Sequence, residues 1–290
     1  MKNRQNVIVT GSKGFIGLHL VDTLRTLEYT VQEWSHDVRQ ISDHKIHSSV
    51  VFHLAARITP SKFIDSPKES FEINTQGTQA VLDYCRRVGA KCIFTSTSGI
   101  YQGSDQLIQV TEHSNAQPSS RYGISKLIAE QLCNFESEVN GVTSVILRLF
   151  NVYGPGQKLP FIVPYIIKNL TNNEPIDLKT PQANRDFVHV SDVVDALIKS
   201  VKIETPGCHI YNIGTGIPTK ISELINLCEN LLDTKAVINL AMNEHTESGI
   251  YANASAANAN LGWKHKISLT KGLNALISET PLDPDTKSKS

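Results

Sequence analysis

Short, almost wholly apolar segments recur along the first half of the chain and alternate with longer segments of helical pattern. The apolar segments are Asn6–Thr10, Val50–Leu54, Lys91–Thr95 and Ser144–Leu147. Strands this apolar are covered on both faces, as in a parallel sheet. The helical patterns between them span Phe15–Leu27, Pro67–Val88 and Arg121–Val139. This repeated order of strand and helix predicts a doubly wound α/β sheet.

The pattern changes after residue 156, where helical and loop segments alternate with isolated short strands at Asp186–Val190 and His209–Ile213. We therefore predict a first domain over residues 1–158, to which the chain returns around residues 186–213. A smaller α/β cap is predicted over residues 159–280. Residues 281–290 are polar with two prolines and are predicted to form a disordered tail.

Composition narrows the class of protein. The 290 residues include 28 basic and 28 acidic side chains, and a net charge of zero argues against broad binding to nucleic acid or anionic membranes. No apolar run approaches the ~18 residues that a membrane helix needs, and the N-terminus lacks a signal-peptide core. The five cysteines form no C-x-x-C pair, so neither a disulfide framework nor a metal site is expected. We expect a cytoplasmic enzyme.

Three glycines follow the first predicted strand directly and open the first predicted helix. In Thr10–Gly17, Gly11 permits a tight turn, and Gly14 allows the backbone to approach a pyrophosphate. Gly17 allows the helix to pack closely on the strand. The helix N-terminus adds free N–H groups and the positive end of a dipole. The position of the glycines between a strand and a helix predicts a nucleotide-binding turn.

Tyr122 and Lys126 are one helical turn apart, so their side chains project from one face of the predicted helix. A phenol has a pKa of ~10 in water, too high for a base at neutral pH. A neighbouring ammonium favours the phenolate and lowers that pKa. The pair therefore fits acid–base chemistry, although exposed helix faces also carry such pairs.

Motifs along nearly the whole chain resemble the extended, sugar-nucleotide-modifying branch of the short-chain dehydrogenase/reductase superfamily. In chain order they are G-x-x-G-x-x-G at Gly11–Gly17, then His53–Ala56, Asn74–Thr78, Phe94–Tyr101, Tyr122–Lys126, Leu147–Pro155, Arg185–Val193, Asn212–Gly214 and Leu261–Trp263. The chain is identified as a member of this family. Membership implies a Rossmann-type dinucleotide-binding domain, a smaller substrate-binding cap and a nucleotide-diphosphate sugar as substrate.

The resemblance also implies roles for individual residues. Catalysis falls to Thr97, Tyr122 and Lys126; Thr97 is selected because it lies four residues before Tyr101, and a register shift of one would select Ser96 or Ser98. The residues expected to bind the dinucleotide are Gly11, Lys13, Gly14, Phe15, Ile16, Gly17, Ser35, Asp37, Val38, Leu54, Ala55, Ala56, Asn74, Tyr122, Lys126 and Phe150. The residues expected to bind the substrate are Thr97, Asn151 and Arg185, the last through the diphosphate.

The end of the second predicted strand bears on the choice between NAD and NADP. An acidic residue there would bind the adenosine ribose, but the family position falls on neutral Ser35. Lys13 and Arg39 are available to face a 2′-phosphate, unless both are solvated surface charges. The stretch after Ser35 is shortened, so that Asp37 and Val38 resemble the family's adenine-contacting pair. The sequence favours NADP, with NAD as the alternative.

Departures from the family pattern bear on the reaction. Residues 242–247 lack the arginine that many members carry there, and Asn253 stands where aspartate is usual. Ser98 and Gly99 follow Thr97 in place of the Asp–Glu pair of the 4,6-dehydratases. The last departure argues against a dehydratase.

Three functions remain open. The favoured one is a 4-keto-sugar reductase or dehydrogenase, with hydride transfer at carbon 4 of the sugar. The second is a 4-epimerase with tightly bound NAD, and the third is a non-catalytic nucleotide-binding scaffold. The resemblance also implies a homodimer through the helices near residues 67–88 and 121–139. The nucleotide and the sugar cannot be read from the sequence, because variable cap loops build their pocket.

Overall fold

The computed structural model describes residues 5–178, 180–240 and 248–279. The predicted tail and the segment 242–247 lie outside the described residues. The elements of the first half are β1 (Asn6–Thr10), α1 (Phe15–Thr26), β2 (Thr30–Trp34), η1 (Val38–Asp43), β3 (Val50–His53), α2 (Pro60–Asp65), α3 (Pro67–Val88), β4 (Lys91–Thr97), η2 (Ser98–Ile100), β5 (Leu107–Val110) and α4 (Arg121–Asn140). Those that follow are β6 (Ser144–Leu149), β7 (Asn151–Tyr153), α5 (Ile162–Asn172), β8 (Ile176–Leu178), β9 (Asn184–His189), α6 (Val190–Ser200), β10 (Cys208–Ile213), β11 (Pro218–Lys220), α7 (Ile221–Leu232), β12 (Ile238–Leu240), β13 (Gly249–Ala252), α8 (Ser255–Leu261) and α9 (Leu269–Glu279).

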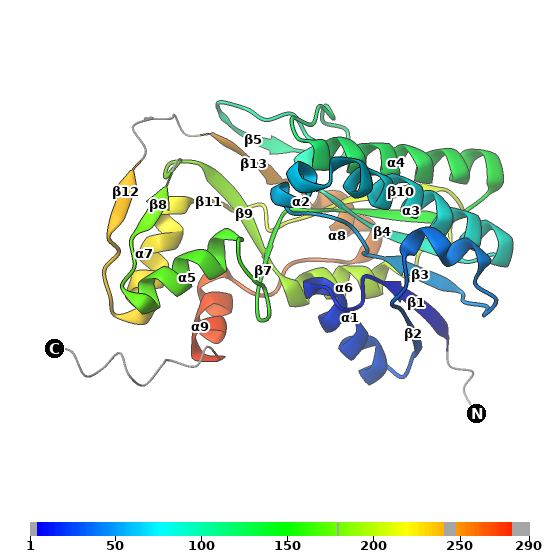
Figure 1. Cartoon of the computed structure of the whole chain (residues 1–290), viewed down its shortest axis with the longest axis horizontal. Helices are drawn as coiled ribbons and strands as arrows, with labels where there is room; N and C mark the ends of the chain where they lie inside the picture. The colour runs from blue at the N-terminus through cyan, green and yellow to red at the C-terminus, as the bar shows by residue number, and fades with distance from the viewer. Residues whose placement is uncertain (1–4, 179, 241–247, 280–290) are drawn as a thin grey trace.

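Six parallel strands form the central sheet in the order β10-β6-β4-β3-β1-β2. Strands β3 and β6 are buried along their whole length, as their apolar sequences require. Helices α1 and α6 cover one face, and η1, α3 and α4 cover the other (Figure 1). The predicted doubly wound α/β sheet is confirmed.

Local signals fix where the two long helices begin and end. Helix α3 begins at Pro67, whose missing N–H costs nothing in the first turn, and ends at Gly89, which has a φ of +70°. The hydroxyl of Ser120 accepts a hydrogen bond from Gly123 N at 3.0 Å and so caps the start of α4. Both helices occupy the ranges that the sequence predicts, within one residue at the end of α4.

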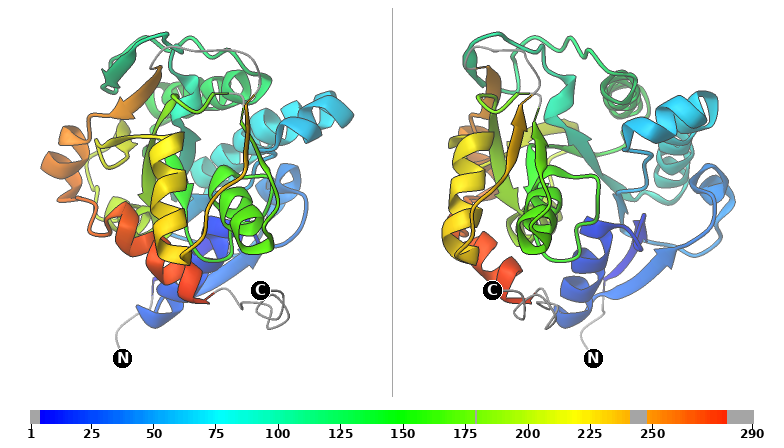
Figure 2. Two further views of the ribbon diagram at one scale, coloured as in Figure 1. Left: turned by 90° about the vertical axis from the view of Figure 1, so that its left-hand side faces the viewer. Right: turned by 60° about the vertical axis from the view of Figure 1, so that its left-hand side comes forward.

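Strand β10 is not the isolated strand expected over His209–Ile213, because it pairs in parallel with β6 at one edge of the central sheet. Strand β9 lies in a separate three-stranded sheet with β7 and β11. Helices α5, α7 and α9 share a further apolar core on that side of the molecule (Figure 2). Strand β13 pairs with β5 from the first half of the chain. The domain boundaries proposed from the sequence stay a prediction.

A buried ion pair joins helix α4 to the centre of the sheet. Arg148 on β6 and Glu130 on α4 are 6% and 2% exposed, and their nearest charged atoms are 2.7 Å apart. Arg148 also donates to the Tyr101 hydroxyl at 3.0 Å, and that hydroxyl donates to Asn212 Oδ1 at 2.6 Å. These bonds connect α4, β6, the residue after η2, and β10, so they hold in register the elements that end at the site described next.

No helix in the described part of the chain is long and apolar enough to cross a membrane. Within the same residues, no three His, Cys, Asp or Glu side chains form a group able to hold a metal ion. The five cysteines are free thiols.

Candidate active site

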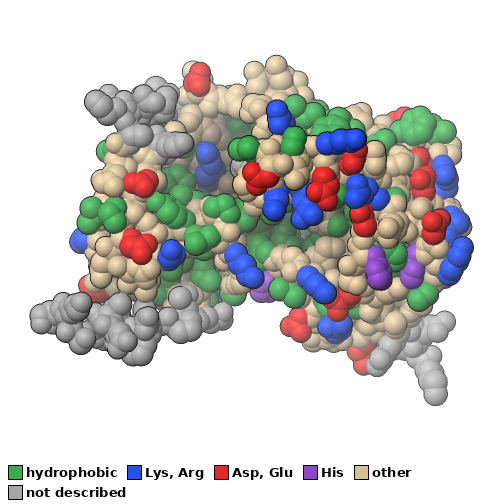
Figure 3. Space-filling view, viewed as in Figure 1, with side chains coloured by type: hydrophobic (Ala, Val, Ile, Leu, Met, Phe, Trp, Pro, Cys, Tyr) green, Lys and Arg blue, Asp and Glu red, His purple; other side chains and the backbone are tan. Residues whose placement is uncertain are grey.

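A cavity of about 780 Å³ opens at the carboxyl ends of the central strands (Figure 3). This is the edge at which doubly wound sheets bind ligands. Its wall combines the turn after β1, the ends of β2, β3 and β4, and helix α4. Residues of β7, α5 and β9 close it from the C-terminal half. The cavity therefore lies between the two parts of the chain that the sequence distinguishes.

The glycine turn leaves no room for side chains. Gly11 has a φ of +71°, and a Cβ there would lie 2.7 Å from Ala55 N. A Cβ on Gly17 would collide with Gly11 O, and one on Gly14 would lie 3.1 Å from the same oxygen. The turn therefore packs tightly against the end of β3 and lines the cavity at the start of α1. This is the shape that a dinucleotide phosphate site requires.

The end of β2 supplies the polar groups of the adjoining wall. Ser35, His36 and Asp37 line the cavity, as does Lys13 from the glycine turn. Arg39 is not part of the lining; its Nε lies 3.0 Å from the Asp37 carboxylate, and it also contacts Glu72. The hydrogen bonds of Arg39 lower the pKa of Asp37. Lys13, within the glycine turn, is thus the cation that lines this end of the cavity. For Arg39, the interpretation as a surface charge fits better than a contact with a 2′-phosphate.

Asn74, expected to bind the dinucleotide, lies behind the cavity wall and is not part of the lining. Its amide accepts from Arg57 N at 2.8 Å and donates to Arg57 O at 3.0 Å. It also donates to the Ser125 hydroxyl at 2.9 Å. Asn74 therefore ties the loop after β3 to helix α4, and its expected role in binding the dinucleotide stays a prediction.

His53 forms a second buried link below the site. Thr78 donates its hydroxyl proton to Asn74 O, so His53 Nε2 is the donor in its 3.0 Å bond to Thr78 Oγ1. His53 Nδ1 then accepts from Thr10 Oγ1 at 2.9 Å. Burial, with a contribution from Lys126, lowers the pKa of His53 to about 3. The ring is a neutral cross-link between β1, β3 and α3.

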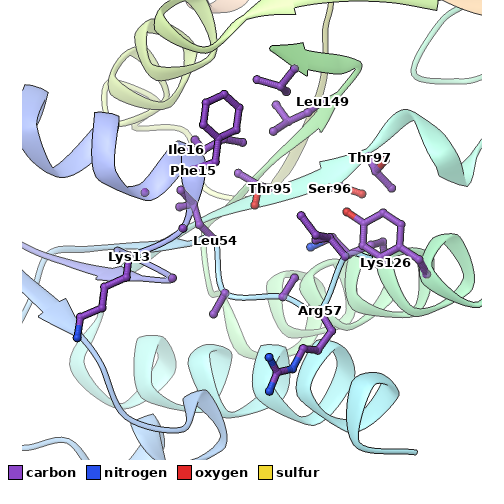
Figure 4. A pocket seen from close by; sticks show the side chains of 18 of the residues that line it. Lys13, Phe15, Ile16, Leu54, Arg57, Thr95, Ser96, Thr97, Lys126 and Leu149 are labelled. Carbon is purple, nitrogen blue, oxygen red and sulfur yellow. The ribbon is translucent and has the colours of Figure 1, made fainter. Parts of the chain in front are cut away.

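The three residues proposed for catalysis share one region of the cavity wall. Thr97 ends β4 and Lys126 lies on α4, and Figure 4 shows both beside the cavity. Tyr122 lies one turn before Lys126 on the same helix. A Cβ on Gly123 would collide with Gly99 O, so glycine is what allows α4 to approach η2 this closely. The Lys126 ammonium lies 4.1 Å from the centre of the Phe94 ring.

Burial sets the protonation of the pair. It raises the pKa of Tyr122 to about 12, and a hydrogen bond with Thr97 acts in the opposite direction. Burial lowers the pKa of Lys126 to about 7, while Cys133 and Glu130 act in the opposite direction. Tyr122 is therefore a protonated acid at neutral pH, and Lys126 titrates near neutral pH.

The local geometry favours Thr97 over its neighbours as the hydroxyl partner. Ser96 and Ser98 also line the cavity. The Ser96 hydroxyl is buried and has no hydrogen-bond partner within the described residues. Thr97 contacts Tyr122 and accepts from Gly99 N at 3.1 Å. The register read from Tyr101 therefore fits the contact with the phenol.

The residues expected to bind the substrate differ in position. Phe150 and Asn151 line the cavity, and the Asn151 amide donates to Asp186 O at 3.3 Å. Arg185 is not part of the lining; it donates to Asn184 O at 2.8 Å, and burial lowers its pKa. Within the described residues no carboxylate pairs with Arg185. A half-buried guanidinium in this position is suited to an anion.

Several lining residues were not assigned a role from the sequence. They include Trp34, His36, Arg57, Ile58, Glu69, Gln157, Phe161, Ile162, Val163 and Phe187. Arg57 directly follows His53–Ala56, so its place after a strand end was a usable signal. Phe187 lies within the motif Arg185–Val193, which gave it no role, and no local pattern marks Phe161, because α5 reaches the cavity only through tertiary packing.

The chain is similar to known proteins along nearly its whole length. The profile of the NAD dependent epimerase/dehydratase family matches residues 7–214. The chain is 30% identical over 303 residues to a putative UDP-glucose 4-epimerase of Methanocaldococcus jannaschii, covering 94% of this chain and 97% of the other. It is 30% identical over 318 residues to dTDP-4-dehydro-6-deoxyglucose reductase of Escherichia coli, covering 96% and 98%. The structure of MoeE5 in complex with UDP-glucose and NAD superposes with a TM-score of 0.85 at 28% identity, covering 94% and 97%. The resemblance drawn from the motifs is confirmed.

Lys126 predicts a pH dependence of stability in the protein without bound ligands. Its pKa is about 7 in the folded chain and ~10.4 in an unfolded one. Between these values the unfolded chain binds more protons, so the free energy of unfolding rises with pH. From about pH 7 to about pH 9, wild type should gain about 2 kcal/mol relative to Lys126→Met. Urea unfolding at each pH measures this difference, and parallel curves for the two proteins would contradict it.

Proposed function

Because the chain belongs to the NAD dependent epimerase/dehydratase family and is an enzyme of that family, we propose that it transfers hydride at carbon 4 of a nucleotide-diphosphate sugar. We propose reduction of a 4-keto-sugar as its direction. The observation that carries this proposal is the meeting of Thr97, Tyr122 and Lys126 on one wall of the cavity, beside the glycine turn.

The residues around the glycine turn fit a nicotinamide dinucleotide. The glycine turn forms a cradle in which side chains at Gly11 and Gly17 would collide with the backbone of the turn and of the loop after β3. The turn also opens α1 with free N–H groups. Neutral Ser35 and cationic Lys13 line the same end, and Asp37 is already engaged by Arg39. This balance of charge supports NADP over NAD, because no free carboxylate would repel a 2′-phosphate.

In the proposed reduction, Tyr122 is the proton donor. A dinucleotide bound in the cavity supplies the hydride. Tyr122 Oη gives its proton to the carbonyl oxygen at carbon 4, and Thr97 Oγ1 donates a hydrogen bond to that oxygen as charge develops. The Lys126 ammonium stabilises the resulting phenolate. With its raised pKa, Tyr122 is protonated at neutral pH, as a proton donor must be before the reaction.

The substrate proposal rests on Arg185 and Asn151. Arg185 is half-buried with no carboxylate partner in the described part of the chain, as expected of a group that meets a diphosphate. Asn151 lines the cavity and offers an amide. The side chains that line the cavity from Leu149 onward carry no charge within the described residues, which suits a neutral sugar ring.

The alternative is a 4-epimerase, which oxidises the sugar and reduces it again without releasing the dinucleotide. The identity to the putative UDP-glucose 4-epimerase of Methanocaldococcus jannaschii favours it. An assay of nicotinamide absorbance separates the reductase from the epimerase. Its substrates are UDP-, dTDP-, GDP- and CDP-sugars, each in the 4-hydroxyl and the 4-keto form. The proposal expects turnover that consumes added NADPH. Purified protein that carries stoichiometric NAD and interconverts two epimers with no added cofactor contradicts it.

Removal of one hydroxyl tests the proton donor. Tyr122→Phe should lower kcat by at least about a hundredfold, because the proton then comes from water. The dissociation constant for NADPH should stay within about twofold, since the ring and the cradle remain. Tyr165→Phe is the matched control, because it removes a hydroxyl that accepts from Asp177 N on the surface. Wild-type turnover in Tyr122→Phe would sink the role assigned to this phenol.

We also propose a homodimer through α3 and α4. Ile124, Ile128, Phe135 and Val139 lie on one face of α4 and are exposed, and hydrophobic side chains show along this edge in Figure 3. Such a stripe at helical spacing is suited to packing against another helix.

A charge in this stripe should prevent association. Phe135→Arg should convert a dimer of the wild-type protein into a monomer at micromolar concentration, because an unpaired guanidinium would be buried in the contact. Leu240→Arg, at an exposed site on β12, is the matched control and should remain dimeric. Light scattering after size exclusion measures the mass, and a monomeric wild-type protein would refute the proposal.

A further inference from the structure

Helix α2 buries a single side chain. Within residues 61–65 only Phe63 is buried, at 4% exposed, whereas its neighbour Ile64 is 75% exposed. The Phe63 ring meets the ring of Tyr122 edge-on, with centroids 6.3 Å apart and planes inclined at 66°. The apolar anchor of α2 therefore lies against the side chain proposed to transfer the proton.

Two other helices hold the backbone of α2 in place. Arg121 Nη1, from the residue before Tyr122, donates to Phe63 O at 3.1 Å. The hydroxyl of Ser70 on α3 donates to Lys62 O at 2.9 Å, and Ser70 is itself 1% exposed. These bonds fix α2 beside the N-terminal end of α4 (Figure 1), so the position of the Phe63 ring is set relative to Tyr122.

Tyr122 has contacts on two sides. Its hydroxyl meets Thr97 at the end of β4, and its ring meets Phe63 of α2. Phe63 is not part of the cavity lining, whereas Tyr122 is. The contact between the two rings is therefore the route by which the Phe63 side chain meets the proposed reaction site.

We propose that Phe63 is a positioning residue, which rests on the function proposed for Tyr122: its ring holds the phenol with the hydroxyl at Thr97 and keeps water from the outer side of the ring. An edge-on aromatic contact restricts rotation of the phenol without offering it a hydrogen bond. Without this ring, water reaches the phenol and the hydroxyl leaves the position from which it meets the reacting oxygen.

Burial is the cause of the raised pKa of Tyr122, so removal of the Phe63 ring should lower it. The charged groups near the site on the surrounding elements include Arg121, Lys126 and Glu130 on α4, Lys62 and Asp65 on α2, Glu69 on α3 and Arg57 on the loop after β3. All of them remain in a Phe63 variant, so a change in the titration of Tyr122 reports the loss of the ring.

The first measurement needs no substrate. Phenolate absorbance is followed with pH in wild type and Phe63→Ala, each against the same protein carrying Tyr122→Phe, so that the difference isolates Tyr122. In Phe63→Ala a step should appear between about pH 10 and about pH 11, close to the value of a solvated phenol. Wild type should show no step in that range. Identical difference curves would overturn the proposal.

The second measurement uses NADPH with dTDP-4-dehydro-6-deoxyglucose as the probe. Phe63→Ala should lower kcat by about tenfold to a hundredfold, with the dissociation constant of NADPH within about twofold of wild type. Phe63→Leu, which keeps apolar bulk beside the phenol, should recover most of the lost turnover. Ile64→Ala, on the exposed side of the same helix, should match wild type.

The outcomes separate this proposal from the proposed function. A shifted titration in a protein that reduces no keto-sugar supports the role of Phe63 and contradicts the reaction. The role of Phe63 is overturned if Phe63→Ala loses both NADPH binding and turnover. It is also overturned if Phe63→Ala and Phe63→Leu have equal turnover. Far-UV circular dichroism and the melting temperature of each variant establish that the folded protein is what is compared.

Discussion

The ion pair between Arg148 and Glu130 is the interaction on which the arrangement of the site depends. It joins the middle of the sheet to helix α4 at a point one turn beyond Lys126, and both charges are almost completely buried. Removal of one partner from such a pair costs about 3–5 kcal/mol, because the other charge is left without compensation. Tyr101 and Asn212 extend the bonds to η2 and β10. The strand end that carries Thr97 and the helix that carries Tyr122 are thus fixed to the same buried charge.

Electrostatics divide the cavity into two ends. The charged side chains of its lining, namely Lys13, Asp37, Arg57, Glu69 and Lys126, all come from the first half of the chain. The C-terminal half contributes aromatic, aliphatic and amide side chains such as Phe161, Phe187 and Gln157. An apolar lining lowers the local dielectric, so charge interactions beside it act more strongly than in water. Burial raises the pKa of Tyr122 and lowers that of Lys126, and the rings of Phe63 and Phe94 are among the groups that cover them.

The sequence predicts the elements well where the signal is local. The apolar run Asn6–Thr10 forms β1, and the helix from Pro67 to Val88 is found with the same bounds, because a proline and a glycine mark its ends. It predicts less where a residue's neighbours come from distant segments. Asn74 does not line the cavity; it holds the backbone at Arg57. No spacing in the sequence reveals this contact between α3 and the loop after β3. The sequence does not indicate the contact between Phe63 and Tyr122 either, since a single phenylalanine in a short helix forms no motif.

The placement of β10 has a consequence for any attempt to divide the molecule. This strand comes after α6 in the chain, yet it completes the edge of the sheet beside β6, and β13 returns further still to pair with β5. A fragment that stopped near residue 207 would leave the edge of β6 unpaired, a row of open backbone groups prone to aggregation. The central sheet is therefore not built from one contiguous stretch of chain, because its edge strand β10 follows β7, β8 and β9, which lie in other sheets.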